Sequence, residues 1–171
     1  MLDASDHISG PVDAPYELVM YGDFQCPYCT AAQSILRRVR DRLEGRLRFA
    51  FRHFPLSEIH PDAWRAAEAA EAAGAQGSFW EMHDALYANG GHFGESDLAA
   101  LADRIGLDVE RFRAELAAGA YTDRVQRDFD AGRAAGVAGT PAFFVNGRLH
   151  SESFDARSLV EALTSDSPDG D

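Results

Sequence analysis

The strongest constraint on the fold is a pair of cysteines in segment 21–29, which reads YGDFQCPYC. Cys26 and Cys29 are the only cysteines of the chain, so they form one chemical unit. A short apolar stretch precedes the pair, and after it apolar residues recur at helical spacing as far as Leu43. The pair is therefore predicted to lie where a strand turns into a helix.

This position has chemical consequences for the first cysteine. Unsatisfied backbone N–H groups and the positive end of the helix dipole favour a thiolate at a helix N-terminus. Pro27 suits the first turn, where its missing N–H costs nothing. We expect Cys26 to be an exposed nucleophile with a low pKa, and Cys29, one turn further on, to be a shielded resolving thiol. The spacing is typical of a redox pair.

Two other uses of such a pair are a structural disulfide and half of a zinc site. Zinc needs two further ligands, but the six histidines are scattered without a paired spacing. In a reducing compartment, a lone C-x-x-C is more often catalytic or metal-binding than structural. We therefore favour redox chemistry and predict no metal.

Charge and length limit the possible partners and the number of domains. A chain of 171 residues is long enough for one well-buried core and does not call for two independent domains. Its formal net charge of -12 would repel nucleic acid and anionic membrane surfaces, so neither is an expected partner.

The beginning of the chain bears on its location. Residues 1–7 lack the basic and apolar regions of a secretory signal, and no apolar run approaches membrane-spanning length. As written, the sequence predicts a cytoplasmic protein. A chain from which an export signal had been removed would read the same way, so an exported protein stays an alternative.

The pattern along the first third of the chain indicates a strand, a helix and a second strand. The strand covers 16–22, the helix 27–43, and from residue 47 apolar and charged residues alternate as in a second strand. Such a unit has parallel strands joined by a right-handed crossover. A further edge strand is possible around His7.

From Pro61 to about Gly136, helix signals follow one another without strand signals. Ser78, Ser96 and Asp108 are predicted to cap successive helices in this region. Trp64, Phe79, Trp80 and Phe93 have the spacing of a buried helix face, so we expect packing rather than a peptide groove.

Strand signals return at 140–145, where Asn146 and Gly147 predict a hairpin turn into a second short strand. Asp155 is then predicted to cap a terminal helix. The order βαβ, helices, ββα is that of an α/β thioredoxin-like fold with an inserted all-helical subdomain. We place the core at 1–59 and 138–171 and the helical insertion at 60–137.

With these residues in view, the chain resembles the DsbA-type thiol-disulfide oxidoreductases. The resemblance is carried by segment 21–29, by 51–56, by Phe79 and Trp80, and by 136–141, the first and last being the most specific. It implies an enzyme that exchanges its disulfide with cysteine-containing protein substrates and with a redox partner that the sequence does not identify. It implies no cofactor. No segment is left over for a dimerisation domain, so we expect a monomer.

The resemblance also implies a substrate-binding face. Pro141 would follow a cis peptide bond and lie against the cysteine pair, while Thr140 would offer backbone groups to a bound substrate strand. Pro27 and Tyr28, between the cysteines, would face the substrate. The predicted site is therefore Cys26 and Cys29 for catalysis, with Pro27, Tyr28, Thr140 and Pro141 for substrate binding.

The chain departs from many exported members of this family at two positions. Tyr28 stands where they have a histidine between the cysteines, and Met20 stands where they have an acidic residue. Without a cationic histidine the thiolate is less stabilised, which favours a milder couple. Asp23 is the nearest acid, and His53 and His60 are expected to be ordinary loop residues.

The direction of exchange is open. We rank oxidase or reductase above isomerase, and a thioredoxin-like binding module without enzymatic activity remains an alternative.

Overall fold

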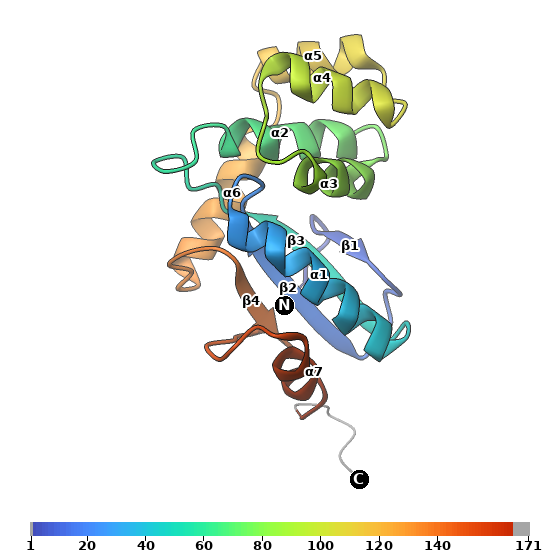
Figure 1. Ribbon diagram of the computed structural model, residues 1–171, viewed down its shortest axis with the longest axis vertical. Helices are drawn as coiled ribbons and strands as arrows, with labels where there is room; N and C mark the ends of the chain where they lie inside the picture. Colours follow the sequence, from blue (N-terminus) through green and yellow to red (C-terminus); the bar gives the residue numbers. More distant parts are fainter. Residues whose placement is uncertain (1, 166–171) are drawn as a thin grey trace.

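The computed structural model describes residues 2–165 and contains a five-stranded sheet with a layer of helices beyond one end (Figure 1). The elements follow in the order β1 (His7–Ser9), β2 (Tyr16–Gly22), α1 (Pro27–Leu43), β3 (Leu47–His53), α2 (Ala63–Gly74), α3 (Phe79–Ala88), α4 (Glu95–Arg104), α5 (Val109–Ala117), α6 (Thr122–Ala134), β4 (Ala142–Val145), β5 (Arg148–Leu149) and α7 (Ala156–Ser165).

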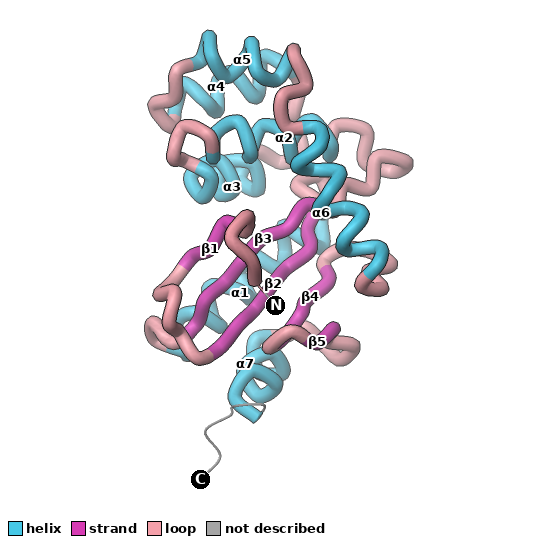
Figure 2. The backbone as a smooth tube through the Cα atoms, turned by 180° about the vertical axis from the view of Figure 1, so that it is seen from behind, coloured by secondary structure: helices cyan, strands magenta, loops and turns pink. Residues whose placement is uncertain are grey.

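The strands lie in the order β1-β3-β2-β4-β5, which is visible from behind in Figure 2. β2 and β3 are parallel, and β4 joins the other side of β2 in the antiparallel sense. The hairpin between β4 and β5 turns at Asn146 and Gly147, both with positive φ, as a tight primed turn requires. The predicted α/β thioredoxin-like order, βαβ followed by ββα, is confirmed.

Alternation along β2 divides the core into two faces. Leu18 and Met20 are fully buried on the face covered by α1 and α7. Val19 and Tyr21 point to the opposite face, where Phe129 of α6 packs. Figures 1 and 2 show α1 and α6 on opposite sides of the sheet. Both faces are apolar because both are covered.

Gly132 lets α6 approach the sheet closely. A Cβ at this position would lie 2.8 Å from ring atoms of both Phe54 and Tyr21. The close packing of α6 on the sheet therefore depends on a residue without a side chain.

The helical layer is built around α2, whose alanines face its neighbours. Ala66, Ala69, Ala70 and Ala73 are fully buried, and α2 contacts α3, α5 and α6. Small side chains allow these helices to pack closely. The predicted boundaries between core and helical insertion, at residues 60 and 137, stay a prediction, because α6 contacts both α2 of the helical layer and β3 of the sheet. Residues 1 and 166–171, which were predicted to belong to the core, lie outside the described part.

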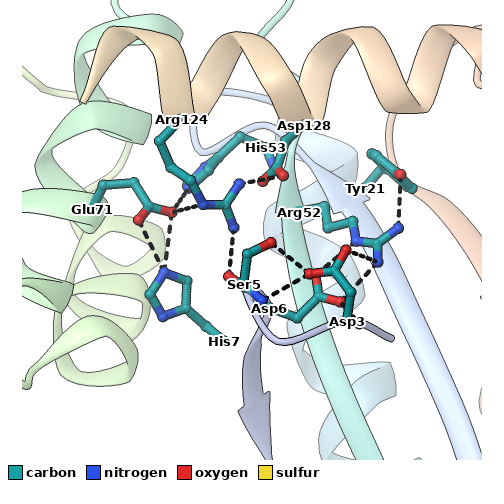
Figure 3. A network of polar contacts seen from close by, with 10 residues as sticks. All are labelled: Asp3, Ser5, Asp6, His7, Tyr21, Arg52, His53, Glu71, Arg124 and Asp128. Carbon is teal, nitrogen blue, oxygen red and sulfur yellow. Dashed lines mark hydrogen bonds and ion pairs between the residues drawn. The ribbon is translucent and has the colours of Figure 1, made fainter. Parts of the chain in front are cut away.

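A buried polar network joins the sheet to the helical layer (Figure 3). Glu71 of α2 lies 2.8 Å from Nε2 of His53 and 3.0 Å from Nε2 of His7. Arg124 of α6 pairs with Asp128, whose other carboxylate oxygen accepts a hydrogen bond from the N–H of His53. Burial alone would raise the pKa of Glu71, but hydrogen bonds from His53 and His7 lower it.

The expectation that His53 is a loop residue is wrong. It ends β3 with 1% of its surface exposed, because Glu71 from α2 compensates the buried imidazole. The chain before β1 is also fixed here, since Arg52 makes two 2.8 Å hydrogen bonds to the carboxylate of Asp6 (Figure 3).

Two predicted helix caps are corrected by the structure. Ser78 precedes α3, but its side chain makes no capping hydrogen bond; its φ of -128° and ψ of 41° are not the extended values of a capping serine. Ser96 lies inside α4, which begins at Glu95, and Asp97 instead accepts a hydrogen bond from the N–H of Gly94. Asp108 and Asp155 do cap α5 and α7, as predicted.

Candidate active site

Cys26 is the residue that immediately precedes α1. Its φ of -74° and ψ of 121° are extended, and Pro27 occupies the first turn, as the sequence predicts. The N–H of Cys26 donates to the carbonyl of Asp23, while its own carbonyl accepts from Thr30 at 3.1 Å. The thiol is thus fixed at the positive end of the helix.

The second part of the site is the loop before β4, which lies far from the cysteines along the chain. β4 pairs with β2 so that Ala142 is opposite Tyr21, which brings the preceding loop beside the start of α1. The Thr140–Pro141 bond in that loop is cis, as the resemblance implied. The carbonyl oxygen of Thr140 lies 3.6 Å from Sγ of Cys26.

Both cysteines are free thiols, and both are buried. Cys26 exposes 3% of its surface and Cys29 none, so the expectation of an exposed Cys26 is wrong. The reason is the Thr140 loop, which packs against the sulfur. Tyr28, in contrast, is 69% exposed and lines a hollow of about 410 Å³ with Thr140 and Pro141.

The pKa of Cys26 is lowered from 9.0 to about 5. The largest cause is a hydrogen bond from the Cys29 thiol, which stabilises the thiolate, and burial opposes it. The Thr140 side chain lowers the pKa further, as do the backbone N–H groups of Cys29 and Tyr28. At neutral pH, Cys26 is therefore a thiolate.

The pKa of Cys29 is shifted the other way. Burial raises it most, and the interaction with Cys26 raises it further, so Cys29 stays a protonated thiol. This division, a thiolate at the helix terminus and a neutral thiol inside, is the asymmetry expected of a nucleophile and a resolving cysteine.

The hydroxyl of Thr140 has an unusual environment. Its oxygen is buried and has no hydrogen-bond partner among the described residues. A buried hydroxyl without a partner is costly. A Cys26 thiolate would accept its hydrogen, so the charged form of the nucleophile satisfies a group that the neutral form leaves unpaired.

Asp23 holds the turn before Cys26, a role that the sequence did not establish. Its side chain is fully buried; Oδ1 accepts from the N–H of Gln25, and Oδ2 lies 2.9 Å from the N–H of Leu56 and 2.8 Å from Nδ1 of His60. The carboxylate therefore ties the active-site turn to the loop after β3.

His60 is consequently not an ordinary loop residue, and this expectation is also wrong. It is separated from Asp23 by 37 positions, so no local pattern could have paired them. Met20, in contrast, is fully buried among apolar residues. Asp23 supplies a buried carboxylate three residues before the nucleophile.

Gln25 adds a second attachment of the turn. Its side-chain oxygen accepts from the N–H of Asp62, and its amide nitrogen donates to the carbonyl of Gly91. The cysteine loop is therefore held both by the core and by the helical layer. Within residues 2–165, no group of three or more histidine, cysteine or acidic side chains is gathered so as to hold a metal ion.

A thioredoxin-type sheet with a thiolate at a helix N-terminus, a buried second thiol and an adjacent cis-proline loop defines a thiol-disulfide oxidoreductase. The family model described as thioredoxin matches residues 3–165, and the chain belongs to that family. Its fold is also that of DsbA proteins of known structure.

Two solved structures illustrate the similarity. A thioredoxin-like oxidoreductase from Silicibacter pomeroyi is 26% identical with a TM-score of 0.83, covering 94% of this chain and 91% of that one. The thiol-disulfide exchange protein alpha-DsbA2 from Wolbachia pipientis is 20% identical with a TM-score of 0.80, covering 95% and 88%. The latter likeness concerns the fold.

A related sequence occurs within a longer curated protein. The chain is 47% identical over 160 residues to a protein of Salinispora arenicola named Na(+)/H(+) antiporter NhaA 1, covering 94% of this chain and 24% of that protein. The chain thus spans about a quarter of the relative's length. Among the helices of the described part, none combines the length and hydrophobicity needed to span a bilayer.

Proposed function

We propose that this protein exchanges disulfides with cysteine-containing protein substrates through a mixed disulfide at Cys26. The observation that carries the proposal is the asymmetry of the pair: the pKa of Cys26 is lowered to about 5, while that of the buried Cys29 is raised. Only one of the two sulfurs is then a nucleophile, and it lies beside Thr140, where a substrate strand would bind.

In the oxidising direction, a substrate thiolate attacks Sγ of Cys26 in the Cys26–Cys29 disulfide. The sulfur–sulfur bond of the enzyme breaks, and Cys29 leaves with the electron pair and takes up a proton. A second substrate thiolate then attacks the substrate sulfur of the mixed disulfide and releases Cys26 as a thiolate. Two electrons pass from the substrate to the enzyme.

The low pKa of Cys26 supports the oxidising direction. A thiolate that is stabilised in the reduced enzyme is a good leaving group and makes the enzyme disulfide more oxidising. Tyr28 adds no positive charge, so we place the couple between a strong oxidant and a reductant. Measuring the reduction potential against glutathione determines the direction.

The other site residues have positional roles in this proposal. Pro27 starts the helix whose N-terminus stabilises the thiolate, and Tyr28 contributes exposed surface to the substrate face. Thr140 and Pro141 form the loop along which the substrate backbone would pair. Ion antiport belongs to the name of the curated relative. The proposal for this chain rests on the cysteine pair and on the Thr140–Pro141 loop beside it.

The test is to react the oxidised protein with a reduced peptide that contains two cysteines and to follow disulfide formation. Wild type should turn over in the presence of oxidised glutathione. Given the same peptide in its oxidised, disulfide-bonded form, Cys29→Ser should accumulate a mixed disulfide with the peptide at Cys26, visible by mass, because the Cys26 thiolate opens the peptide disulfide and no second protein thiol resolves the product. Cys26→Ser should accumulate none. Trapping at Cys29 in the Cys26→Ser protein, and not at Cys26 in its counterpart, would refute the assignment of the nucleophile.

A further inference from the structure

The exchange reaction leaves the path of one proton unassigned. When the Cys26–Cys29 bond breaks, the sulfur of Cys29 carries the electron pair and must take up a proton, yet none of the surface of Cys29 is exposed. Burial penalises the charged form of this thiol and is the largest cause of its raised pKa. The reaction therefore needs a proton donor inside the protein, next to the sulfur.

The hydroxyl of Tyr87, on α3, lies in the right place to be this donor. Cys26, Thr140 and Tyr87 all interact with the side chain of Cys29. Cys26 is the reaction partner of Cys29, and the Thr140 side chain donates to the Cys26 thiolate. The Tyr87 hydroxyl is therefore the group left to serve the second sulfur.

The ring of Tyr87 is fixed by its neighbours. It packs against Phe24 and His83, with ring centroids 4.9 Å and 5.1 Å away. A Cβ on Gly22, the last residue of β2, would lie 3.0 Å from the Tyr87 hydroxyl oxygen. The absence of a side chain at Gly22 thus leaves room for the hydroxyl beside the turn that carries the cysteines.

The hydrogen of this hydroxyl is only weakly held in the reduced protein. Its acceptor is the carbonyl of Asp23 at 3.5 Å, whereas an O–H···O hydrogen bond is usually about 2.7–2.8 Å long. The same carbonyl already accepts the N–H of Cys26 at 3.2 Å. Turning the hydroxyl toward a charged sulfur therefore gives up little.

The carboxylate of Asp23 is a poorer candidate, because its oxygens are committed elsewhere. They accept hydrogen bonds from the N–H groups of Gln25 and Leu56, and one of them lies 2.8 Å from Nδ1 of His60. An ionised carboxylate accepts hydrogen bonds and has no proton to donate.

A hollow between α1 and α3 gives Tyr87 a source of protons. We call it the α1–α3 hollow; it has a volume of about 440 Å³ and is lined by Tyr87 and Gln33, among others. The side-chain amide of Gln33 donates to the carbonyl of Cys29 at 3.1 Å, so the hollow lies directly behind the buried cysteine. Arg37 and Asp84, both exposed, also line it, and solvent can therefore enter.

The charged and titratable groups around Tyr87 leave it protonated. They are Asp23, Cys26 and Cys29 in and after the active-site turn, Arg37 and Arg40 on α1, and His83 and Asp84 on α3. Burial raises the pKa of Tyr87 well above its ordinary value, and Cys29, Asp23 and Cys26 raise it further. Burial also lowers the pKa of His83. At neutral pH Tyr87 is thus a neutral donor.

We propose that Tyr87 is a catalytic residue that passes its hydroxyl proton to the sulfur of Cys29 as the Cys26–Cys29 bond breaks. Its oxygen regains a proton from solvent in the α1–α3 hollow, so Tyr87 is unchanged after each cycle and no electron passes through it. In the resolving direction, the proton leaves Cys29 by the same route and the sulfur attacks the mixed disulfide. This inference rests on the proposed exchange reaction and adds a residue of the helical layer to it.

The first experiment mixes the reduced protein with excess oxidised glutathione, stops the reaction with acid and follows the protein by mass. In the first step the Cys26 thiolate opens glutathione disulfide and forms a mixed disulfide, at a rate proportional to the glutathione concentration. In the second step Cys29 displaces glutathione and closes the protein disulfide, at a rate independent of that concentration. Only the second step requires Cys29 to lose its proton.

The variants are Tyr87→Phe, which removes the hydroxyl alone, and the matched control Tyr16→Phe. Tyr16 is 7% exposed, like Tyr87, but lies at the end of β2 away from the cysteines. Tyr87→Phe should slow the second step roughly a hundredfold, the lower end of what general acid–base catalysis contributes, and leave the first step unchanged. Tyr16→Phe should change neither step.

The second experiment observes the sulfur of Cys29 directly. Cys26→Ser leaves Cys29 as the only thiol of the chain, so its S–H stretching band in the Raman spectrum is unobscured. Adding Tyr87→Phe should shift this band, because a hydrogen bond to the sulfur is lost, and adding Tyr16→Phe should not. An unshifted band would mean that the hydroxyl does not reach Cys29.

The outcomes separate this inference from the proposed function. An unchanged second step in Tyr87→Phe, or two steps slowed by the same factor, would refute the role of Tyr87 and leave the exchange reaction standing. A second step slowed in Thr140→Val but not in Tyr87→Phe would assign the proton to Thr140 instead. If Cys26 of the wild type forms no mixed disulfide, the proposed function is refuted and the role of Tyr87 with it.

Discussion

The carbonyl oxygen of Thr140 lies 3.6 Å from Sγ of Cys26, although 114 positions separate the two residues. The contact closes the active face over the nucleophile and leaves 3% of the surface of Cys26 exposed. The loop therefore controls access to the sulfur, and its Thr140 side chain also contributes to the lowered pKa of Cys26.

Titration of the reduced protein should give a thiolate with a midpoint near pH 5, because the pKa of Cys26 is lowered to about 5. Ultraviolet absorbance of the thiolate, or the pH profile of alkylation, measures it. Cys29→Ala removes the largest cause of the shift and should raise the midpoint. A midpoint near the ordinary thiol value of about 8.5 would contradict the site geometry.

Thr140→Val should raise the pKa of Cys26 by about one, the rough worth of one hydrogen bond to a charged group. The valine has the same shape but cannot donate to the thiolate. Thr164→Val is the control, since the Thr164 hydroxyl bonds only to carbonyls of its own helix. Equal midpoints in wild type and Thr140→Val would mean that the hydroxyl does not reach the sulfur.

The stability advantage of the reduced form should depend on pH. Because the folded pKa of Cys26 is depressed to about 5, the thiolate contributes stability that is complete above the unfolded pKa of about 8.5 and is lost as pH falls through 5. The oxidised form has no thiolate. Denaturant unfolding of both forms between pH 4 and 9 should show the reduced form gaining on the oxidised form as pH rises; a constant difference would argue against a shifted thiol.

Glu71→Gln should destabilise the protein by about 3 kcal/mol, because it breaks a buried ion-pair network and leaves its partners uncompensated. His53, His7 and Arg124 all face this carboxylate. Glu161→Gln is the control, since its pairing with Arg157 is exposed to solvent and such pairs contribute little to stability. Urea unfolding at neutral pH measures the stability of both variants. Equal losses would mean that the buried polar network around Glu71 adds little to the free energy of unfolding.

Gly132→Ala should also destabilise the protein, by about 1–3 kcal/mol, even though alanine is the better helix former. The added Cβ would lie 2.8 Å from ring atoms of Tyr21 and Phe54. Thermal unfolding measures the loss. Gly139→Ala, where an added Cβ meets no atom within 4 Å, should change the midpoint little. A stabilised Gly132→Ala would show that α6 can move away from the sheet without cost.

Local patterns predicted most of the framework. The bounds of β2 and α1 match the predicted ranges because apolar periodicity and Pro27 are read within one element. The caps at Asp108 and Asp155 follow the same logic. The predicted cap at Ser78 was wrong. The backbone N–H of Ser78 donates to the carbonyl of Ala73 in the turn after α2, and the backbone angles of Ser78 in this turn do not suit a capping serine.

The polar contacts of the site were beyond such reasoning. Asp23 and His60 are hydrogen-bond partners 37 positions apart, and His53 and Glu71 are partners 18 positions apart. Only the packing of α2 and of the loop before it brings each pair together. The burial of Cys26 was missed for the same reason, since it depends on Thr140. The spacing of the cysteines was enough to predict a redox pair, but the residues that set the burial and the pKa of Cys26 include some from distant segments of the chain.

The separation of Cys26 from Thr140 also has a consequence during synthesis. A ribosome releases the nucleophile 114 residues before the loop that covers it. The nascent chain therefore presents an uncovered cysteine pair to the oxidants and thiols around it, and the sulfur comes under its cover only when β4 has joined β2. Protection of the reactive group therefore has to wait until the segment that follows the helical layer has been made.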